Sequence, residues 1–274
     1  MRTLVLALML FASPLAAQTR CGEIATIDPP EGGKFALSIA TPEAKPSAVL
    51  ILLPGGNGMS NLDAGGCAKD LRGNSLIRSI PDFVKGGVVT ALADSPIEWR
   101  GRDGLAGFRV ELAHAQALGV AVAEMRKHFG VPVWLVGTSR GAISAANAAS
   151  RLDGDAKPDG VVITSPVSAG ARGNLPWVAH DVFMFPLDRI AMPLLVLGHA
   201  KDTCLRSPPT NVKHIAEKAS ASPRRQAAIM EGGPGSNAKP GDLAACEGRQ
   251  PHGFVDQEAD MAAGILRFVA GGRF

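Results

Sequence analysis

The stretch VPVWLVGTSRGAISAANAASR, residues 131–151, decides the fold of this chain. It begins with a mostly apolar run, 131–137, which predicts a buried strand. It ends with an alanine-rich run, 140–151, which predicts a helix packed closely on a sheet. Between them lies Gly-Thr-Ser-Arg-Gly, residues 137–141, a Gly-x-Ser-x-Gly motif at a strand-to-helix turn. Such a turn strains the backbone of its serine, and the flanking glycines avoid clashes.

Short apolar runs alternate with helical patterns along the rest of the chain. Because these strands are continuously apolar and separated by helices, we expect a mostly parallel sheet that helices cover on both faces. Right-handed crossovers make this α/β sheet doubly wound, and ligands bind beyond the carboxyl ends of its strands. The irregular stretch 166–189 is either a small lid or a plain connection. The expected strands are 35–40, 48–53, 88–93, 131–137, 161–164, 193–197 and 225–230, and the expected helices are 75–84, 108–129, 140–151, 211–219 and 254–268.

The motif, its strand and helix, and the order of the elements resemble the α/β-hydrolase family. The resemblance implies that Ser139 is a nucleophile, followed along the chain first by an acid and then by a histidine. It also implies chemistry that needs no cofactor. A metal site is not expected, because the four cysteines form no Cys-x-x-Cys pair.

The resemblance also implies where the other two catalytic groups lie. His252 stands after the last expected strand and before the last expected helix, which is the family's position for the base. Asp202 follows the strand 193–197 by a short turn and resembles the family's acid, which orients the imidazole without taking its proton. Asp94, at the end of the strand 88–93, is the alternative acid, but it precedes the nucleophile in the chain.

An oxyanion hole requires backbone N–H groups that point at the developing negative charge. The family pattern implies that the amide of Arg140, directly after the nucleophile, is one donor. The second belongs to the Gly-rich loop 54–58, where either Gly56 or Asn57 donates. The Arg140 side chain has two interpretations, contact with an anionic substrate or a structural ion pair on its helix.

Two further residues are candidates for contact with the substrate. His199 ends the strand 193–197, so we expect it in the wall of the site or directly behind the wall. Trp177 lies in the irregular stretch that forms either a lid or a connection.

The first residues predict export. Arg2 is followed by an apolar run, 4–11, and the small residues Ala16 and Ala17 suit cleavage, so residues 1–17 are interpreted as a signal peptide. The remaining residues, 18–274, are expected to form a single domain in the periplasm or outside a bacterial cell. The apolar run is too short for stable insertion of the protein into a membrane.

Export gives the four cysteines a meaning, because oxidising compartments favour disulfides. Sequence alone permits three complete pairings. If the implied acid and base meet at one site, Cys204 and Cys246 come near each other, because Cys204 follows the acid by two residues and Cys246 precedes the base by six. We therefore expect Cys204–Cys246, which leaves Cys21–Cys67.

Composition narrows the function classes. The net charge is only +3 and the basic residues are scattered, so no nucleic-acid partner is expected. The leading hypothesis is hydrolysis of a small-molecule or polymeric ester through an acyl-enzyme on Ser139. A peptidase or amidase that uses the same triad, and a non-catalytic binding protein that retains the fold, are the alternatives. The oligomeric state is not predicted.

Overall fold

A computed structural model describes residues 20–101, 103–169, 180–239 and 241–274 of the chain. The predicted signal peptide, residues 1–17, lies outside the described residues, and so does Trp177.

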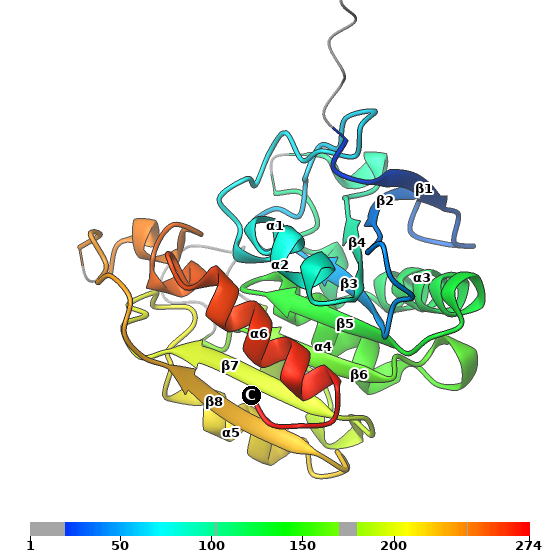
Figure 1. The fold of residues 1–274 in the computed structure, drawn as a ribbon. Helices are drawn as coiled ribbons and strands as arrows, with labels where there is room; N and C mark the ends of the chain where they lie inside the picture. Colours follow the sequence, from blue (N-terminus) through cyan, green and yellow to red (C-terminus); the bar gives the residue numbers. More distant parts are fainter. Residues whose placement is uncertain (1–19, 102, 170–179, 240) are drawn as a thin grey trace, which may run out of the picture.

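One eight-stranded sheet runs through the molecule in the order β1-β2-β4-β3-β5-β6-β7-β8 (Figure 1). The strands from β3 to β8 are parallel to one another. β1 pairs antiparallel with β2, and β2 pairs antiparallel with β4. The prediction of a doubly wound, mostly parallel α/β sheet is confirmed. The strands are β1 (Glu23–Ile27), β2 (Phe35–Ala40), β3 (Val49–Leu53), β4 (Val89–Ala93), β5 (Val133–Thr138), β6 (Gly160–Thr164), β7 (Leu194–His199) and β8 (Arg225–Met230).

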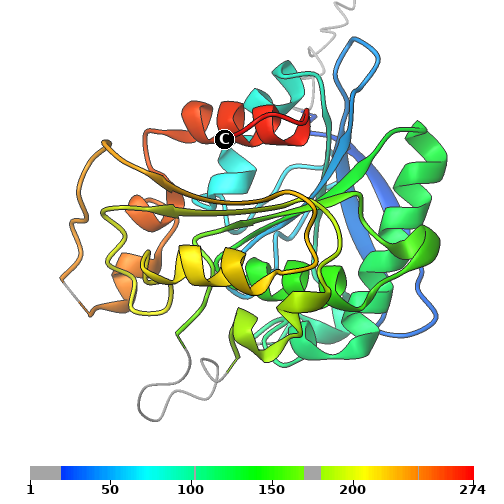
Figure 2. The same cartoon turned by 90° about the horizontal axis from the view of Figure 1, so that it is seen from below.

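Helices cover both faces of this sheet, and Figure 2 shows the sheet nearly edge-on between the two helical layers. On one face, α3, α4 and α5 pack against alternate strand residues such as Val49 and Ile51. On the other face, α1, α2 and α6 pack against the intervening strand residues, such as Leu50 and Leu52. The helices are α1 (Ser75–Arg78), α2 (Ile80–Lys85), α3 (Leu112–Phe129), α4 (Gly141–Arg151), α5 (Asn211–Lys218) and α6 (Glu258–Val269).

The double cover explains the continuously apolar strands. Every residue of β3, β4, β5, β6 and β7 is buried, so neither face of these strands tolerates a regular alternation with charged side chains. Burial of each large aliphatic side chain stabilises the fold by about 2 kcal/mol relative to exposure. The two edge strands β1 and β8 are half exposed.

Four elements differ from the sequence prediction. The helix expected over 108–129 begins at Leu112, after a 3-10 turn at Phe108–Val110 and the extended Glu111. The helix expected over 75–84 is two short helices, because Ser79 ends α1 and Pro81 lies in the first turn of α2. The closing helix begins at Glu258 rather than at residue 254, because Phe254 and Asp256 have φ angles of 53° and 59°, which a right-handed helix excludes. The antiparallel strand β1 was not predicted.

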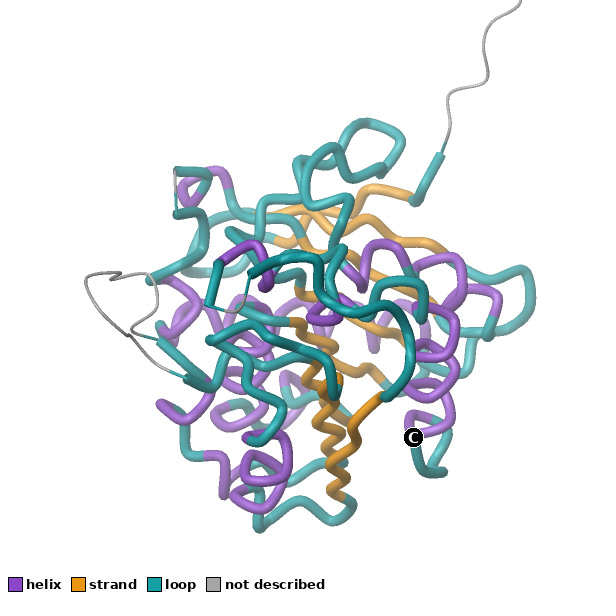
Figure 3. Tube along the Cα trace, turned by 90° about the vertical axis from the view of Figure 1, so that its left-hand side faces the viewer, coloured by secondary structure: helices purple, strands orange, loops and turns teal. Residues whose placement is uncertain are grey.

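The loops that follow the strands gather at one end of the sheet, which faces the viewer in Figure 3. Within the irregular stretch 166–189, residues 180–189 contain two 3-10 turns whose Val182 and Leu187 belong to the core. Residues 170–179 lie outside the described part. Among the described residues, no helix has both the length and the apolarity needed to cross a bilayer.

Candidate active site

The turn between β5 and α4 places Ser139 at the carboxyl end of the sheet. Its φ angle is 54°, a left-handed conformation that costs a non-glycine residue on the order of 1 kcal/mol. The two glycines of the motif are required by close packing. A Cβ atom on Gly137 would overlap the backbone of Gly141, and a Cβ atom on Gly141 would overlap the carbonyl oxygen of Leu53 in β3. The motif therefore presses α4 against the sheet and leaves Ser139 at the apex of the turn.

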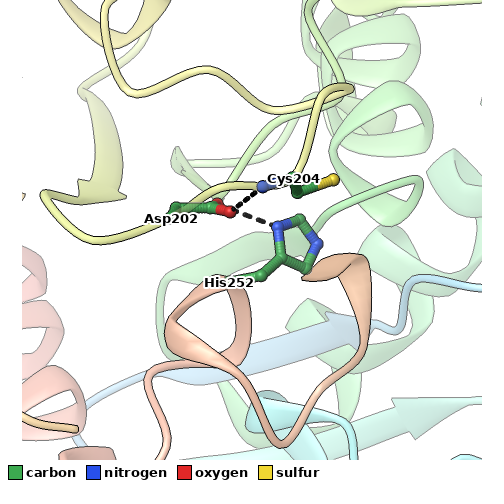
Figure 4. Close-up of side chains that lie close together, drawn as sticks. All are labelled: Asp202, Cys204 and His252. Carbon is green, nitrogen blue, oxygen red and sulfur yellow. Dashed lines mark hydrogen bonds and ion pairs between the residues drawn. The ribbon is translucent and has the colours of Figure 1, made fainter. Parts of the chain in front are cut away.

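His252 and Asp202 form a buried pair near this turn. The His252 Nδ1 atom lies 2.9 Å from Asp202 Oδ2, and both side chains are almost completely buried (Figure 4). The other carboxylate oxygen, Oδ1, accepts the backbone N–H of Cys204 at 2.8 Å. Because an ionised carboxylate only accepts hydrogen bonds, this geometry assigns the proton to Nδ1 and leaves a lone pair on Nε2. Nε2 is buried and has no hydrogen-bond partner within the described part of the chain.

Ser139, His252 and Gly56 line one cavity at the carboxyl end of the sheet. Ser139 and Gly56 also line a neighbouring cavity of about 300 Å³, together with Arg140. The turn of β5 and the loop after β3 approach each other closely here. A Cβ atom on Gly55 would lie 2.8 Å from the Cβ atom of Ser139. The structure therefore brings the expected nucleophile, base and donor loop to one place.

The loop that carries His252 is held by groups that the sequence analysis did not identify. The Ser165 hydroxyl donates to the backbone carbonyl of His252 at 2.7 Å. The guanidinium of Arg78 donates to the carbonyls of Gly248 and Gly253 at 2.7 and 2.8 Å and pairs with Glu258. Arg78 lies at least 170 residues from these partners in the chain, and Ser165 lies 87 residues from His252. No local sequence pattern therefore indicates either contact.

The donor loop after β3 has its own support from beneath. Arg109 is almost completely buried, and its guanidinium donates to the Pro54 carbonyl at 3.0 Å and to the Ser144 hydroxyl of α4 at 2.7 Å. Burial, and to a lesser degree the positive charge of Arg140, lowers the pKa of Arg109 to about 9, so the side chain keeps its charge at neutral pH. This arginine joins the loop to the helix that follows the nucleophile.

Asp94, the alternative acid, also supports that loop. Its Oδ1 accepts the backbone N–H groups of Ser60 at 2.7 Å and Asn61 at 3.2 Å, and its Oδ2 pairs with Arg100 at 2.7 Å. These contacts occupy both carboxylate oxygens. The imidazole of His252 donates its Nδ1–H to Asp202 instead.

His199 lies behind the site rather than in its wall. Its Nε2 is 2.7 Å from the Gln257 amide oxygen, and its Nδ1 accepts the backbone N–H of Lys201 at 3.1 Å. With both ring nitrogens engaged and 1% of the residue exposed, His199 lines neither of the two cavities beside Ser139. His199 was expected as a possible substrate contact. Its surroundings do not favour that role, because both ring nitrogens face other protein groups.

The four cysteines form two disulfides, Cys21–Cys67 and Cys204–Cys246. The second joins the segment after Asp202 to the segment before His252. Asp202, His252 and the Cys204 sulfur lie close enough together to suggest a metal site, with their ligand atoms within 4.8 Å of one another. The donor set does not suit one, because the sulfur is bonded to Cys246 and is not a thiolate.

Neither the models of protein families nor the sequences of curated proteins give a match to this chain. Solved structures do match. The chain has the α/β-hydrolase fold. An α/β serine hydrolase homologue from Coxiella burnetii superposes with a TM-score of 0.57 and 17% identity, over 93% of this chain and 100% of the other.

Two further solved structures agree over most of their length. A soluble variant of monoglyceride lipase from Saccharomyces cerevisiae, in complex with a substrate analogue, has a TM-score of 0.61 and 11% identity over 95% of this chain and 98% of the other. A thermophilic esterase from the planctomycete Thermogutta terrifontis has a TM-score of 0.55 and 17% identity over 90% and 92%. At these identities the likeness concerns the fold, and the activity must be argued from the site.

Proposed function

We propose that the protein is a serine hydrolase that cleaves carboxylic esters through an acyl-enzyme on Ser139. The observation that carries the proposal is the buried Asp202–His252 pair, because His252 lines the same cavity as the strained Ser139 and its Nε2 has no hydrogen-bond partner among the described residues. A serine hydroxyl is a poor nucleophile unless a positioned base takes its proton. A neutral imidazole oriented by a buried carboxylate is such a base.

In the proposed reaction, Nε2 of His252 takes the hydroxyl proton of Ser139 while the Ser139 oxygen bonds to the carbonyl carbon of the ester. The tetrahedral intermediate then collapses, the C–O bond to the alcohol breaks, and the alcohol leaves with that proton. Water attacks the acyl-enzyme in the same manner, with His252 again taking the proton, and the acid is released. Asp202 stays ionised throughout and stabilises the imidazolium.

The negative oxygen of each tetrahedral intermediate requires N–H donors, and we assign these to the amides of Arg140 and Gly56. Gly56 lines both cavities beside the nucleophile, with a φ angle of 57°. Asn57, the other candidate, lines neither of these cavities. This contrast favours Gly56. Loss of one such donor costs roughly 10²- to 10³-fold in kcat.

A fluorophosphonate probe tests the nucleophile directly. We expect the folded mature protein to be labelled, and Ser139→Ala to abolish labelling. Ser220→Ala, which changes an exposed serine in the turn after α5, is the matched control and should label normally. Failure of the wild-type protein to label, or labelling that survives in Ser139→Ala, would favour the alternative of a non-catalytic binding protein.

Turnover of 4-nitrophenyl acetate tests the base and the acid. We expect His252→Ala and Asp202→Asn to lower kcat by about 10⁴-fold or more. His128→Ala, an exposed histidine on α3, should leave kcat unchanged. Aminoacyl 4-nitroanilides separate the ester hydrolase from the peptidase or amidase alternative, which predicts turnover of the anilides at comparable rates.

We also propose that residues 18–274 act as an exported single domain after loss of residues 1–17. The two disulfides support this, because such bonds persist in oxidising compartments. N-terminal sequencing of the protein recovered from a periplasmic fraction should begin at residue 18. An uncut chain in the cytoplasmic fraction would contradict the proposal.

A further inference from the structure

The cavity of about 300 Å³ next to Ser139 has an unusual charge distribution. Arg140 and Arg206 both line it, and among the described residues Asp103 is the carboxylate that lines it with them. Its remaining lining is mostly apolar and includes Val167 and the Cys204–Cys246 bridge. A substrate group that reaches from the nucleophile into this cavity therefore meets two guanidinium groups.

The two arginines are close enough to influence each other. Burial lowers the pKa of Arg140 most, the carboxylate of Asp103 opposes this, and the charge of Arg206 lowers it further. Burial also lowers the pKa of Arg206. Both side chains remain charged at neutral pH, since an arginine in a protein stays protonated there. The described lining of the cavity thus carries two positive charges and one negative charge.

The segment that carries Arg206 is fixed against the loop after β6. Its backbone carbonyl accepts the N–H groups of Ser168 and Ala169 at 2.8 and 3.1 Å. Arg140 is fixed at the first turn of α4 by the nucleophile motif itself. These contacts fix the backbone of both arginines. A guanidinium group recognises a carboxylate by two parallel N–H···O bonds, which are about twice as strong as neutral hydrogen bonds.

We propose that this cavity, the arginine cavity, binds a carboxylate of the substrate, so that the enzyme prefers esters that bear a negative charge near the scissile bond. A half-ester of a dicarboxylic acid is the simplest such substrate. Its ester carbonyl lies at Ser139 and its free carboxylate lies between Arg140 and Arg206. The inference rests on the proposed esterase function and adds the substrate class to it.

The test compares monoethyl glutarate with ethyl pentanoate, which have acyl chains of equal length and differ in the terminal carboxylate. A charge-assisted hydrogen bond contributes about 1.5–3 kcal/mol, so the ratio of kcat/KM should favour the half-ester by roughly 10- to 100-fold. Added salt should reduce this ratio. Equal or faster turnover of ethyl pentanoate by the wild-type enzyme would overturn the inference and leave the esterase function standing.

Variants locate the preference. Arg206→Gln and Arg140→Gln should each lower the ratio about tenfold, and Arg206→Lys should restore part of it because the charge returns. Asp103→Asn should raise the ratio, because it removes the opposing charge. Arg273→Gln is the matched control. Arg273 is exposed and precedes Phe274, whose N–H donates to the Gln226 side chain near the amino end of β8. An unchanged ratio in both arginine-to-glutamine variants would refute the proposal.

Binding keeps the two proposals distinguishable. Titration calorimetry with glutarate on the Ser139→Ala protein measures the arginine cavity without any turnover. We expect saturable binding that weakens about tenfold in Ser139→Ala with Arg206→Gln. If the wild type hydrolyses neither ester but glutarate still binds in this way, the esterase function fails and the anion site stands. If glutarate does not bind, the anion site fails.

Discussion

The two disulfides offer a comparison in which stability and activity separate. They close chain segments of nearly equal length, with sequence separations of 42 for Cys204–Cys246 and 46 for Cys21–Cys67. In the chain-entropy model, each bridge stabilises the fold by about 4 kcal/mol, and the difference between them is on the order of 0.1 kcal/mol. Replacing either pair by alanines should therefore lower the free energy of unfolding by the same amount.

Activity should respond to only one of these changes. Asp202 accepts the backbone N–H of Cys204, and Cys246 precedes His252 by six residues, so the bridge ties the acid segment to the base segment. Without it, small displacements of the imidazole relative to the nucleophile should lower kcat/KM by roughly 10- to 100-fold. The other bridge joins β1's start to the loop after β3 and carries no group of the proposed triad.

Urea denaturation gives the free energy of unfolding, and 4-nitrophenyl acetate gives kcat/KM at a temperature where both double variants are folded. For a chain of this size, a loss of about 4 kcal/mol lowers Tm by roughly 8–16 °C. The explanation fails if Cys204→Ala with Cys246→Ala keeps the wild-type kcat/KM. It also fails if Cys21→Ala with Cys67→Ala loses kcat/KM to the same extent.

Three further changes have specific expected results. Burial is the main cause that lowers the pKa of His114 to about 3, below its usual 6.5. As the pH falls from 7 to 5, the unfolded chain therefore gains a proton on His114 and the folded chain does not, so urea titrations should show that this group lowers the free energy of unfolding by about 2 kcal/mol. His114→Gln should remove this part of the pH dependence. Gly55→Ala should lower kcat by about 10²-fold because its Cβ crowds the nucleophile, whereas Gly107→Ala, which meets open space, should not. Asp94→Asn should lower the free energy of unfolding by about 1–3 kcal/mol and reduce kcat far less than loss of the proposed catalytic acid; a comparable fall in kcat would restore Asp94 as the acid.

The central strands were predictable because their burial is complete. An apolar run such as Val49–Leu53 has no other place in a folded chain, so its pattern determines both the strand and the double helical cover. The edge strand β1 lacks this signal, since most of its residues are at least partly exposed. The start of α6 was misplaced because the left-handed conformations of Phe254 and Asp256 are imposed by the fold and are uncommon for residues other than glycine.

The candidate site likewise contains residues that the sequence pattern predicts and residues that it does not. Ser139, Asp202 and His252 each follow a strand, so the direction of a parallel sheet is enough to bring them to one end. The groups that hold them are contacts between distant segments. Arg78 and Ser165 support the His252 loop through backbone carbonyls, which any sequence supplies equally, so nothing in the residue pattern distinguishes them beforehand.

The Cys21–Cys67 bridge also bears on how the molecule meets other copies of itself. It anchors the start of β1, where the Cys21 N–H also donates to the Gly65 carbonyl at 2.8 Å. As long as β1 stays in place, the unpaired edge of the sheet belongs to a short, largely exposed strand. If β1 detached, β2 would present its open N–H and C=O groups beside the apolar side chains of Phe35 and Leu37, which is the kind of edge that exchanges strands or aggregates. The bridge thus protects the solubility of the chain at a sheet edge remote from the proposed chemistry.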